Sequence, residues 1–147
     1  MRAIVQRVKY SSVEFYKDEE KIINEISAGL QVLVGITQDD TQKDVEYIVD
    51  KITGLRIFED ENDVMNRSLL DINGNILSIS QFTLYGDASK GRRPSYIKAL
   101  GGDKATLLYD EFNNRSYIEI DESNYLIDRD TLENVKGVIR IQENLNQ

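Results

Sequence analysis

A short, nearly continuous apolar run at residues 30–36 sets the strongest constraint on how this chain folds. It reads Leu-Gln-Val-Leu-Val-Gly-Ile, and short β-branched runs of this kind are typical of strands buried on both faces. A hydroxyl on Thr41 and a carboxylate on Asp44 follow at the spacing of a helix N-terminal capping box. We therefore expect a buried strand and then an amphipathic helix, with apolar positions at Val45, Ile48, Val49, Ile52 and Leu55.

Shorter patterns predict further strands. Alternating residues at 2–8 and 12–16 indicate two strands, and a turn at 17–21 then leads into a return strand. Strand character resumes at 55–58, before an acidic turn at 59–63. Asn73 and Gly74 fit a tight hairpin turn, which predicts a long strand over 75–85 placed centrally in a sheet.

A second helix is expected in the last third of the chain. Asp103 is positioned to cap it, and apolar residues recur at helical spacing at Ala105, Leu108, Tyr109 and Phe112. Brief patterns then predict a strand at 116–120, a short helix at 130–135 and a strand at 138–141. Because no linker or internal repeat divides the 147 residues, we expect residues 1–147 to form one domain.

Two absent residue types narrow the chemistry. The sequence contains no cysteine and no histidine. This excludes a thiolate nucleophile and a sulfur-ligated metal site, and it removes the commonest general base and zinc ligand. Catalysis then depends on carboxylates, lysines, hydroxyls, amides, backbone groups or the substrate itself. We expect no metal and no cofactor.

The charge and hydropathy of the chain limit its partners. A net charge of −8 argues against broad binding along nucleic acid, and DNA is not an expected partner. A small basic patch that holds one RNA end is still compatible with this charge. No run approaches the ~20 apolar residues of a membrane-spanning helix, and the first residues lack the apolar core of a signal peptide. We expect a cytoplasmic protein without a membrane partner.

A glutamine interrupts the apolar strand predicted at 75–85. If its amide is buried it must find hydrogen-bond partners, so Gln81 is either a satisfied core or edge residue or part of a binding site. In the second interpretation Ser80, Gln81 and Thr83 present hydroxyls, an amide and backbone N–H groups to a substrate carbonyl or ribose. The residues alone leave both interpretations open.

A basic loop follows this strand within a few residues. It reads Lys-Gly-Arg-Arg-Pro at 90–94. Most exposed charge clusters are solvated turns. In a chain of net negative charge, however, Lys90, Arg92 and Arg93 also fit a phosphate clamp, because arginine forks match phosphate oxygens and Gly91 allows close backbone approach.

Together these segments resemble the D-aminoacyl-tRNA deacylase family, also called D-tyrosyl-tRNA deacylase. The resemblance rests on the opening Met-Arg-Ala-Ile-Val-Gln-Arg-Val, on residues 29–35 and 55–60, on Ser-Gln-Phe-Thr-Leu-Tyr at 80–85, and on the basic loop. It covers about residues 1–100, in the order and spacing of the family.

The resemblance implies a fold, an assembly and a reaction. The fold is a single-domain α/β fold that is β-barrel-like, with antiparallel-rich sheets and two main helices. The assembly is a homodimer with active sites at the subunit interface. The reaction is hydrolysis of the ester between a D-amino acid and the 3′-terminal adenosine of tRNA, with aminoacyl-tRNA as partner, and the nucleophilic route is either Thr83 or one assisted by the ribose 2′-hydroxyl. By the same resemblance the catalytic residues are Ser80, Gln81, Phe82 and Thr83, and the substrate-binding residues are Arg7, Leu84, Tyr85, Lys90, Arg92 and Arg93.

The chain departs from the family after residue 114. Family members end with an Asn-x-Gly-Pro-x-Thr motif, whose Gly-cis-Pro backbone excludes L-amino acids. Here the single proline is Pro94, and residues 115–147 form a divergent tail that we expect to replace the motif. A cis bond without proline costs about 3 kcal/mol, so other residues rarely substitute for it. Three alternatives follow: a deacylase of relaxed chirality, one with a substitute filter built from the tail, or a catalytically impaired homologue that acts as an aminoacyl-tRNA-binding module.

Overall fold

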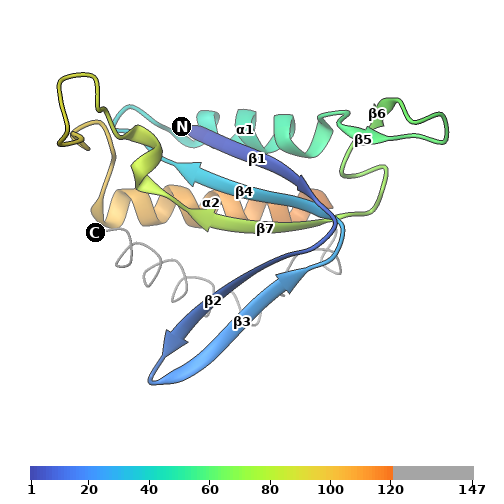
Figure 1. The fold of residues 1–147 in the computed structure, drawn as a ribbon. Coiled ribbons are helices and arrows are strands. Elements are labelled where there is room, and N and C mark those ends of the chain that lie inside the picture. Colours follow the sequence, from blue (N-terminus) through green and yellow to red (C-terminus); the bar gives the residue numbers. More distant parts are fainter. Residues whose placement is uncertain (121–147) are drawn as a thin grey trace.

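A three-stranded sheet forms the centre of the fold (Figure 1). The computed structural model describes residues 1–120. Strand β4 (Gly29–Gly35) lies between β1 (Arg2–Val8), which is antiparallel to it, and β7 (Asn75–Ser80), which is parallel to it. Helices α1 (Gln42–Gly54) and α2 (Gly102–Ile120) pack against each other and against the sheet through one apolar core.

The core is built around β4 because this strand has a neighbour on each side. Leu30 and Val32 are fully buried, as the apolar run predicts. They join α1 through Val45 and Val49 and α2 through Phe112. The buried cluster contains Leu30, Val32, Val34, Ile36, Val45, Val49, Ile52, Phe58, Leu69, Ile76, Tyr109 and Phe112.

Two hairpins extend from this body. Strands β2 (Ser11–Lys17) and β3 (Glu20–Ile26) project away from the helices (Figure 1). Both residues of their turn, Asp18 and Glu19, have positive φ angles of 51° and 68°, the conformation of turns that match strand twist. The smaller hairpin consists of β5 (Phe58–Glu59) and β6 (Met65–Arg67), so strand character begins at Phe58 and not at Leu55.

The predicted capping box at the start of α1 is confirmed. The backbone N–H of Thr41 donates to the Asp44 carboxylate at 2.8 Å, and the Thr41 side chain in turn accepts the backbone N–H of Asp44. The first of these bonds is the main reason that the pKa of Asp44 lies below its ordinary value. A reciprocal bond of this kind satisfies N–H groups that the helix itself leaves without acceptors.

The prediction of one strand over 75–85 is wrong. Strand β7 ends at Ser80, and a single 3₁₀ turn, η1 (Phe82–Tyr85), follows. The carbonyl of Val34 still accepts the N–H of Gln81, at 2.8 Å. The next carbonyl on that edge of β4, that of Ile36, accepts the N–H of Leu100 instead. The chain beyond Gln81 therefore finds no strand partner and turns.

The position of β7 also differs from the prediction. Asn73 has the expected positive φ of 54°, but the strand after it pairs in parallel with β4 and lies at one side of the three-stranded sheet. Its start is fixed where the backbone N–H of Asn75 donates to the Ala28 carbonyl. Gly29 lies opposite, and a Cβ there would approach the Asn75 carbonyl oxygen to 1.9 Å, so the two strands meet only because Gly29 has no side chain.

Three further expectations are corrected. Residues 116–120 are helical because α2 continues against α1, where Arg115 and Glu46 form an ion pair and Ser116 is buried. Asp103 lies in the first turn of α2 and is not its cap, since the helix begins at Gly102. The predicted α/β fold with two main helices and antiparallel-rich sheets is confirmed, but within residues 1–120 the strands form three separate sheets and do not close into a barrel. The predictions at 130–135 and 138–141 lie outside the described residues.

Candidate active site

The turn η1 carries most of the predicted site residues. It begins where β7 ends, so Ser80, Gln81, Phe82 and Thr83 occupy one corner of the sheet. Leu84 donates its N–H to the Gln81 carbonyl at 3.3 Å, and Gly86 donates to the Thr83 carbonyl at 2.9 Å. Gly35 makes room for the turn, because a Cβ at this position would lie 2.9 Å from the Leu84 Cβ. The structure therefore brings the four predicted catalytic residues together.

The side chains of Gln81 and Thr83 form a hydrogen-bonded pair. Gln81 Nε2 donates to the Thr83 hydroxyl oxygen, and both residues are half-buried. An amide that donates into the hydroxyl oxygen withdraws electron density from it and directs its proton outward. This arrangement makes Thr83 a better hydrogen-bond donor than nucleophile, and it supplies the partner that a half-buried glutamine amide needs.

Ser80 and Phe82 line a small pocket beside the turn. Its other walls are Val34 and Ile36 of the β4 edge, with Leu100 and Ala105 from the α2 side. The pocket has a volume of about 20 Å³ and holds roughly one water molecule. Ligand pockets usually measure at least ~300 Å³. A pocket of this size is too small for an aminoacyl group.

Arg2 holds the far end of the turn. Its Nη1 donates to the Leu84 carbonyl at 3.0 Å, and its guanidinium lies 4.4 Å from the centre of the Tyr85 ring. Tyr85 is only 7 % exposed, and this burial raises its pKa, with the negative charge of Asp40 adding to the effect. Leu84 and Tyr85 thus anchor η1 to β1. Sequence patterns did not single out Arg2, since a basic residue in an exposed strand position carries no distinctive signal.

The basic loop leaves the same corner and is closed at its base. Asp87 and Ser95 exchange two backbone hydrogen bonds of 2.8 Å each. Gly91 has a φ of 142°, a backbone conformation that residues with a side chain rarely adopt. Lys90, Arg92 and Arg93 are all exposed. Among residues 1–120 none of these three cations forms an ion pair, so their charges stay available to an anionic ligand.

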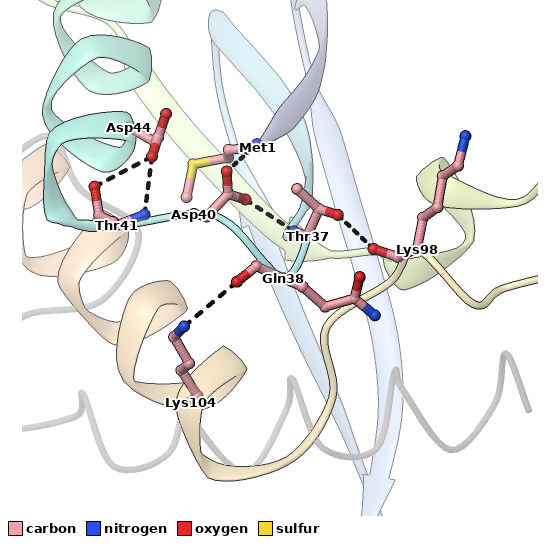
Figure 2. Close-up of polar contacts among 8 residues, drawn as sticks. All are labelled: Met1, Thr37, Gln38, Asp40, Thr41, Asp44, Lys98 and Lys104. Carbon is pink, nitrogen blue, oxygen red and sulfur yellow. Dashed lines mark hydrogen bonds and ion pairs between the residues drawn. The ribbon is translucent and has the colours of Figure 1, made fainter.

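The segment after the loop is fastened to the connection between β4 and α1 (Figure 2). The Thr37 hydroxyl donates to the Lys98 carbonyl, and Lys104 donates to the Gln38 carbonyl at 3.4 Å. Gln38 also donates to the Ile97 carbonyl at 2.6 Å. These bonds hold the polypeptide that returns from the basic loop beside the sheet.

Asp40 fixes the connection itself. Its carboxylate accepts the Thr37 backbone N–H at 2.8 Å and pairs with the ammonium group of Met1 at 2.5 Å (Figure 2). Both side chains are at most 5 % exposed. A buried charge pair of this kind requires that both partners stay in place. Sequence reasoning missed Asp40, because an aspartate next to a helix start has the appearance of an ordinary cap.

Arg7 is not brought to this corner. It lies at the opposite end of β1, opposite Leu30, where Nη1 donates to the Ile57 carbonyl at 2.8 Å. A weak ion pair with Glu59, at 3.9 Å, is largely exposed. Within one chain Arg7 and Thr83 therefore occupy different ends of the sheet.

The described part of the chain shows neither a metal-binding cluster nor a membrane-spanning helix. Within residues 1–120 no cluster of three or more carboxylates is arranged to hold a metal ion. Neither helix in this range is long and apolar enough to cross a membrane.

Known proteins are similar to this chain in sequence and in fold. The family described as D-Tyr-tRNA(Tyr) deacylase matches residues 4–128. D-aminoacyl-tRNA deacylases of Clostridium tetani and Clostridium kluyveri are 63 % and 61 % identical over 112 residues, which cover 76 % of this chain and 73 % of each relative.

Two solved structures resemble the fold. The c-Myc DNA Unwinding Element Binding Protein is 35 % identical and superimposes with a TM-score of 0.75 over 85 % of this chain and 82 % of that one. A probable eukaryotic D-amino acid tRNA deacylase, 20 % identical, gives a TM-score of 0.68 over 82 % and 70 %. With residues 4–128 matched and relatives above 60 % identity, the chain belongs to the D-Tyr-tRNA(Tyr) deacylase family.

Proposed function

We propose that this protein hydrolyses the ester bond between a D-amino acid and the 3′-terminal adenosine of tRNA. The observation that carries the proposal is the Gln81–Thr83 pair at the end of β7, inside the segment that matches the deacylase family. The relatives named D-aminoacyl-tRNA deacylase favour an enzyme over the alternative of a binding module without activity.

The chemistry follows from what the site residues are able to donate. Gln81 orients the Thr83 hydroxyl so that its proton points to the ester carbonyl oxygen, where negative charge develops during attack. Backbone N–H groups at the start of η1 add further donors. These groups act by positioning, which suits a chain with no histidine or cysteine.

The attacking group in this scheme is water and not Thr83. The water oxygen bonds to the carbonyl carbon, the bond from that carbon to the ribose 3′-oxygen breaks, and the 3′-oxygen takes up a proton. The neighbouring ribose 2′-hydroxyl is suited to relay this proton. The products are the free amino acid and uncharged tRNA. Phe82 provides an apolar surface against the adenosine, and Ser80 lines the same small pocket as Phe82.

The basic loop supplies the contact with tRNA in this proposal. Lys90, Arg92 and Arg93 are exposed and make no ion pair within residues 1–120. Because the chain as a whole carries a charge of −8, cations restricted to one loop favour binding of a local phosphate group over binding along a duplex. We place the reaction in the cytoplasm, where aminoacyl-tRNA is consumed by translation.

The active form is proposed to be a homodimer. The pocket of a single chain is too small for an aminoacyl group, and Arg7 lies far from η1 within one chain. Ile4, which is 54 % exposed on β1, offers apolar surface for a second copy. Sedimentation or light scattering that gave a monomer at working concentrations would contradict this part of the proposal.

The test is hydrolysis of D-Tyr-tRNA and L-Tyr-tRNA, each measured against buffer. Release of D-tyrosine well above the buffer rate is expected. Because no Gly-Pro pair is present, the ratio of the D to the L rate shows whether another element rejects L-amino acids. Equal rates would leave the hydrolase in place and remove its chiral selectivity. Buffer rates for both substrates would refute the proposed function.

A further inference from the structure

Tyr96 lies between the two parts of the proposed substrate site. Its ring meets the Phe82 ring edge to face, with 5.3 Å between the centres and 67° between the planes. On its other side in the chain, Ser95 closes the basic loop against Asp87. Tyr96 therefore lies between Phe82, which its ring contacts, and Ser95, which closes the base of the loop that carries the cations at 90–93.

The Tyr96 side chain is held in place and is still accessible. Gly86 leaves space for it, since a Cβ there would lie 3.0 Å from the Tyr96 ring. Its carbonyl accepts the Ala99 N–H at 3.0 Å, and the chain directly after it is bonded to the β4–α1 connection. The residue nevertheless remains 41 % exposed. An aromatic ring that is both fixed and half-exposed binds a flat ligand with little loss of side-chain entropy.

Single exposed aromatic residues are common on protein surfaces and carry no function by themselves. Tyr96 differs because it lies between Phe82 and the basic loop, and a ligand is proposed for each of these. Phe82 lies against the terminal adenosine in the proposed function, and the loop cations suit a phosphate. In the single-stranded 3′ end of tRNA, the group that lies between the ester-linked adenosine and a phosphate further along the strand is an unpaired nucleobase.

We propose that Tyr96 is the stacking platform for the unpaired base next to the terminal adenosine of the tRNA 3′ end. Bases in single-stranded RNA are commonly recognised by stacking on aromatic side chains. The stacked base fixes the direction in which the 3′ end crosses Phe82, with its phosphate near the basic loop. This inference rests on the proposed function and adds a site for a second nucleotide.

The inference is tested by binding of a short RNA that carries no amino acid and has an unpaired 3′ end terminating in adenosine. A matched RNA lacks only the base next to that adenosine. Wild-type protein is expected to bind the complete RNA about tenfold more tightly than the RNA that lacks the base. Tyr96→Ala should weaken binding of the complete RNA by about the same factor and leave binding of the abasic RNA unchanged.

Two variants separate stacking from general effects. Tyr96→Phe keeps the ring and should bind both RNAs as the wild type does. Tyr47→Ala removes a comparably exposed tyrosine from α1, at 62 % exposure, and should change neither affinity.

The inference is overturned if Tyr96→Ala weakens both RNAs equally, if it weakens neither, or if the wild type binds neither RNA. An equal loss would mean that Tyr96 only supports Phe82. Failure of the proposed function has a different signature: no release of D-tyrosine from D-Tyr-tRNA by the wild type, even where base-dependent binding at Tyr96 is present.

Discussion

The core beneath the helices and the corner at η1 are held together by different kinds of interaction. In the core, apolar side chains from β4, α1 and α2 pack with almost no exposed surface. At the corner, hydrogen bonds from Arg2, Gln81 and Thr37 fix a turn and the chain that passes beside it. Burial of apolar side chains stabilises the core, and directional hydrogen bonds stabilise the corner. Stability and activity are therefore expected to respond to different substitutions.

The largest effect on this contrast is expected from Phe112→Ala. Phe112 is fully buried in the core, and removing its ring leaves a cavity that costs about 4 kcal/mol. Urea denaturation monitored by circular dichroism measures the change in the free energy of unfolding. Leu107→Ala on the same helix is the control, because Leu107 is 68 % exposed and its loss should cost less than about 0.5 kcal/mol. Similar losses in the free energy of unfolding for both variants would contradict the view that apolar burial stabilises the core.

Thr83→Ala tests the corner. Loss of a donor to the developing oxyanion lowers kcat by about a hundredfold in comparable sites, while the melting temperature should change little because Thr83 is only half-buried. Rates on D-Tyr-tRNA and thermal melts measure the two quantities. Thr83→Ser keeps the hydroxyl and is expected to retain most of the rate. Gln81→Ala should act in the same direction with a smaller loss, since it acts through Thr83.

A marked loss of stability in Thr83→Ala or Gln81→Ala would favour the structural interpretation of this pair. So would a Gln81→Leu variant that is as stable and as active as the wild type, because an apolar side chain of similar size cannot donate a hydrogen bond.

The double variant Arg92→Ala with Arg93→Ala tests the loop. Its KM for D-Tyr-tRNA should rise about tenfold at low salt with kcat almost unchanged, and the dependence of KM on salt should become shallower. Steady-state rates at several salt concentrations measure this. Lys43→Ala on α1 removes an exposed cation outside the loop and serves as the control. An unchanged KM in the double variant would exclude the loop from substrate binding.

The smallest expected effect is at the start of α1, which belongs to the core side. The pKa of Asp44 is lowered in the folded protein, chiefly by the Thr41 backbone N–H. Its contribution to stability is therefore present above the ordinary aspartate pKa of 3.8 and is lost as the pH falls through the lower folded value. Asp44→Asn should melt slightly below the wild type at pH 7, and the difference should shrink as the pH falls below 3.8 and vanish once the pH is below the lowered pKa of Asp44. A difference that grew in acid would contradict this assignment.

The sequence predicted the core side well because its signals are local. The apolar run of β4 and the Thr41–Asp44 spacing each specify an element without help from distant residues. For the corner, the sequence predicted which residues belong together but not that they form a 3₁₀ turn. The alternation that predicts a strand continues through Thr83, whereas the turn exists because Leu100 occupies the Ile36 carbonyl. No local pattern reports that competition.

Residues 116–120 failed for a related reason. Their β-branched and aromatic character favours a strand, but the contact of α2 with α1 extends the helix. Sequence patterns did not single out Arg2 and Tyr96, because each makes its contact at the corner through the folded structure, Arg2 with Leu84 and Tyr96 with Phe82.

The parallel pairing of β4 with β7 also has a consequence for the order in which the molecule folds. The β1–β4 pair has only the β2–β3 hairpin between its strands, whereas β7 reaches β4 after a crossover that includes α1, β5 and β6. Long loops cost more entropy to close, and distant pairings form slowly. We therefore expect β7 and η1 to dock on β4 after the β1–β4 pair has formed, at a place that Gly29 keeps open for the Asn75 backbone. The corner where we propose that substrate binds is then assembled on a strand pair that is already in place.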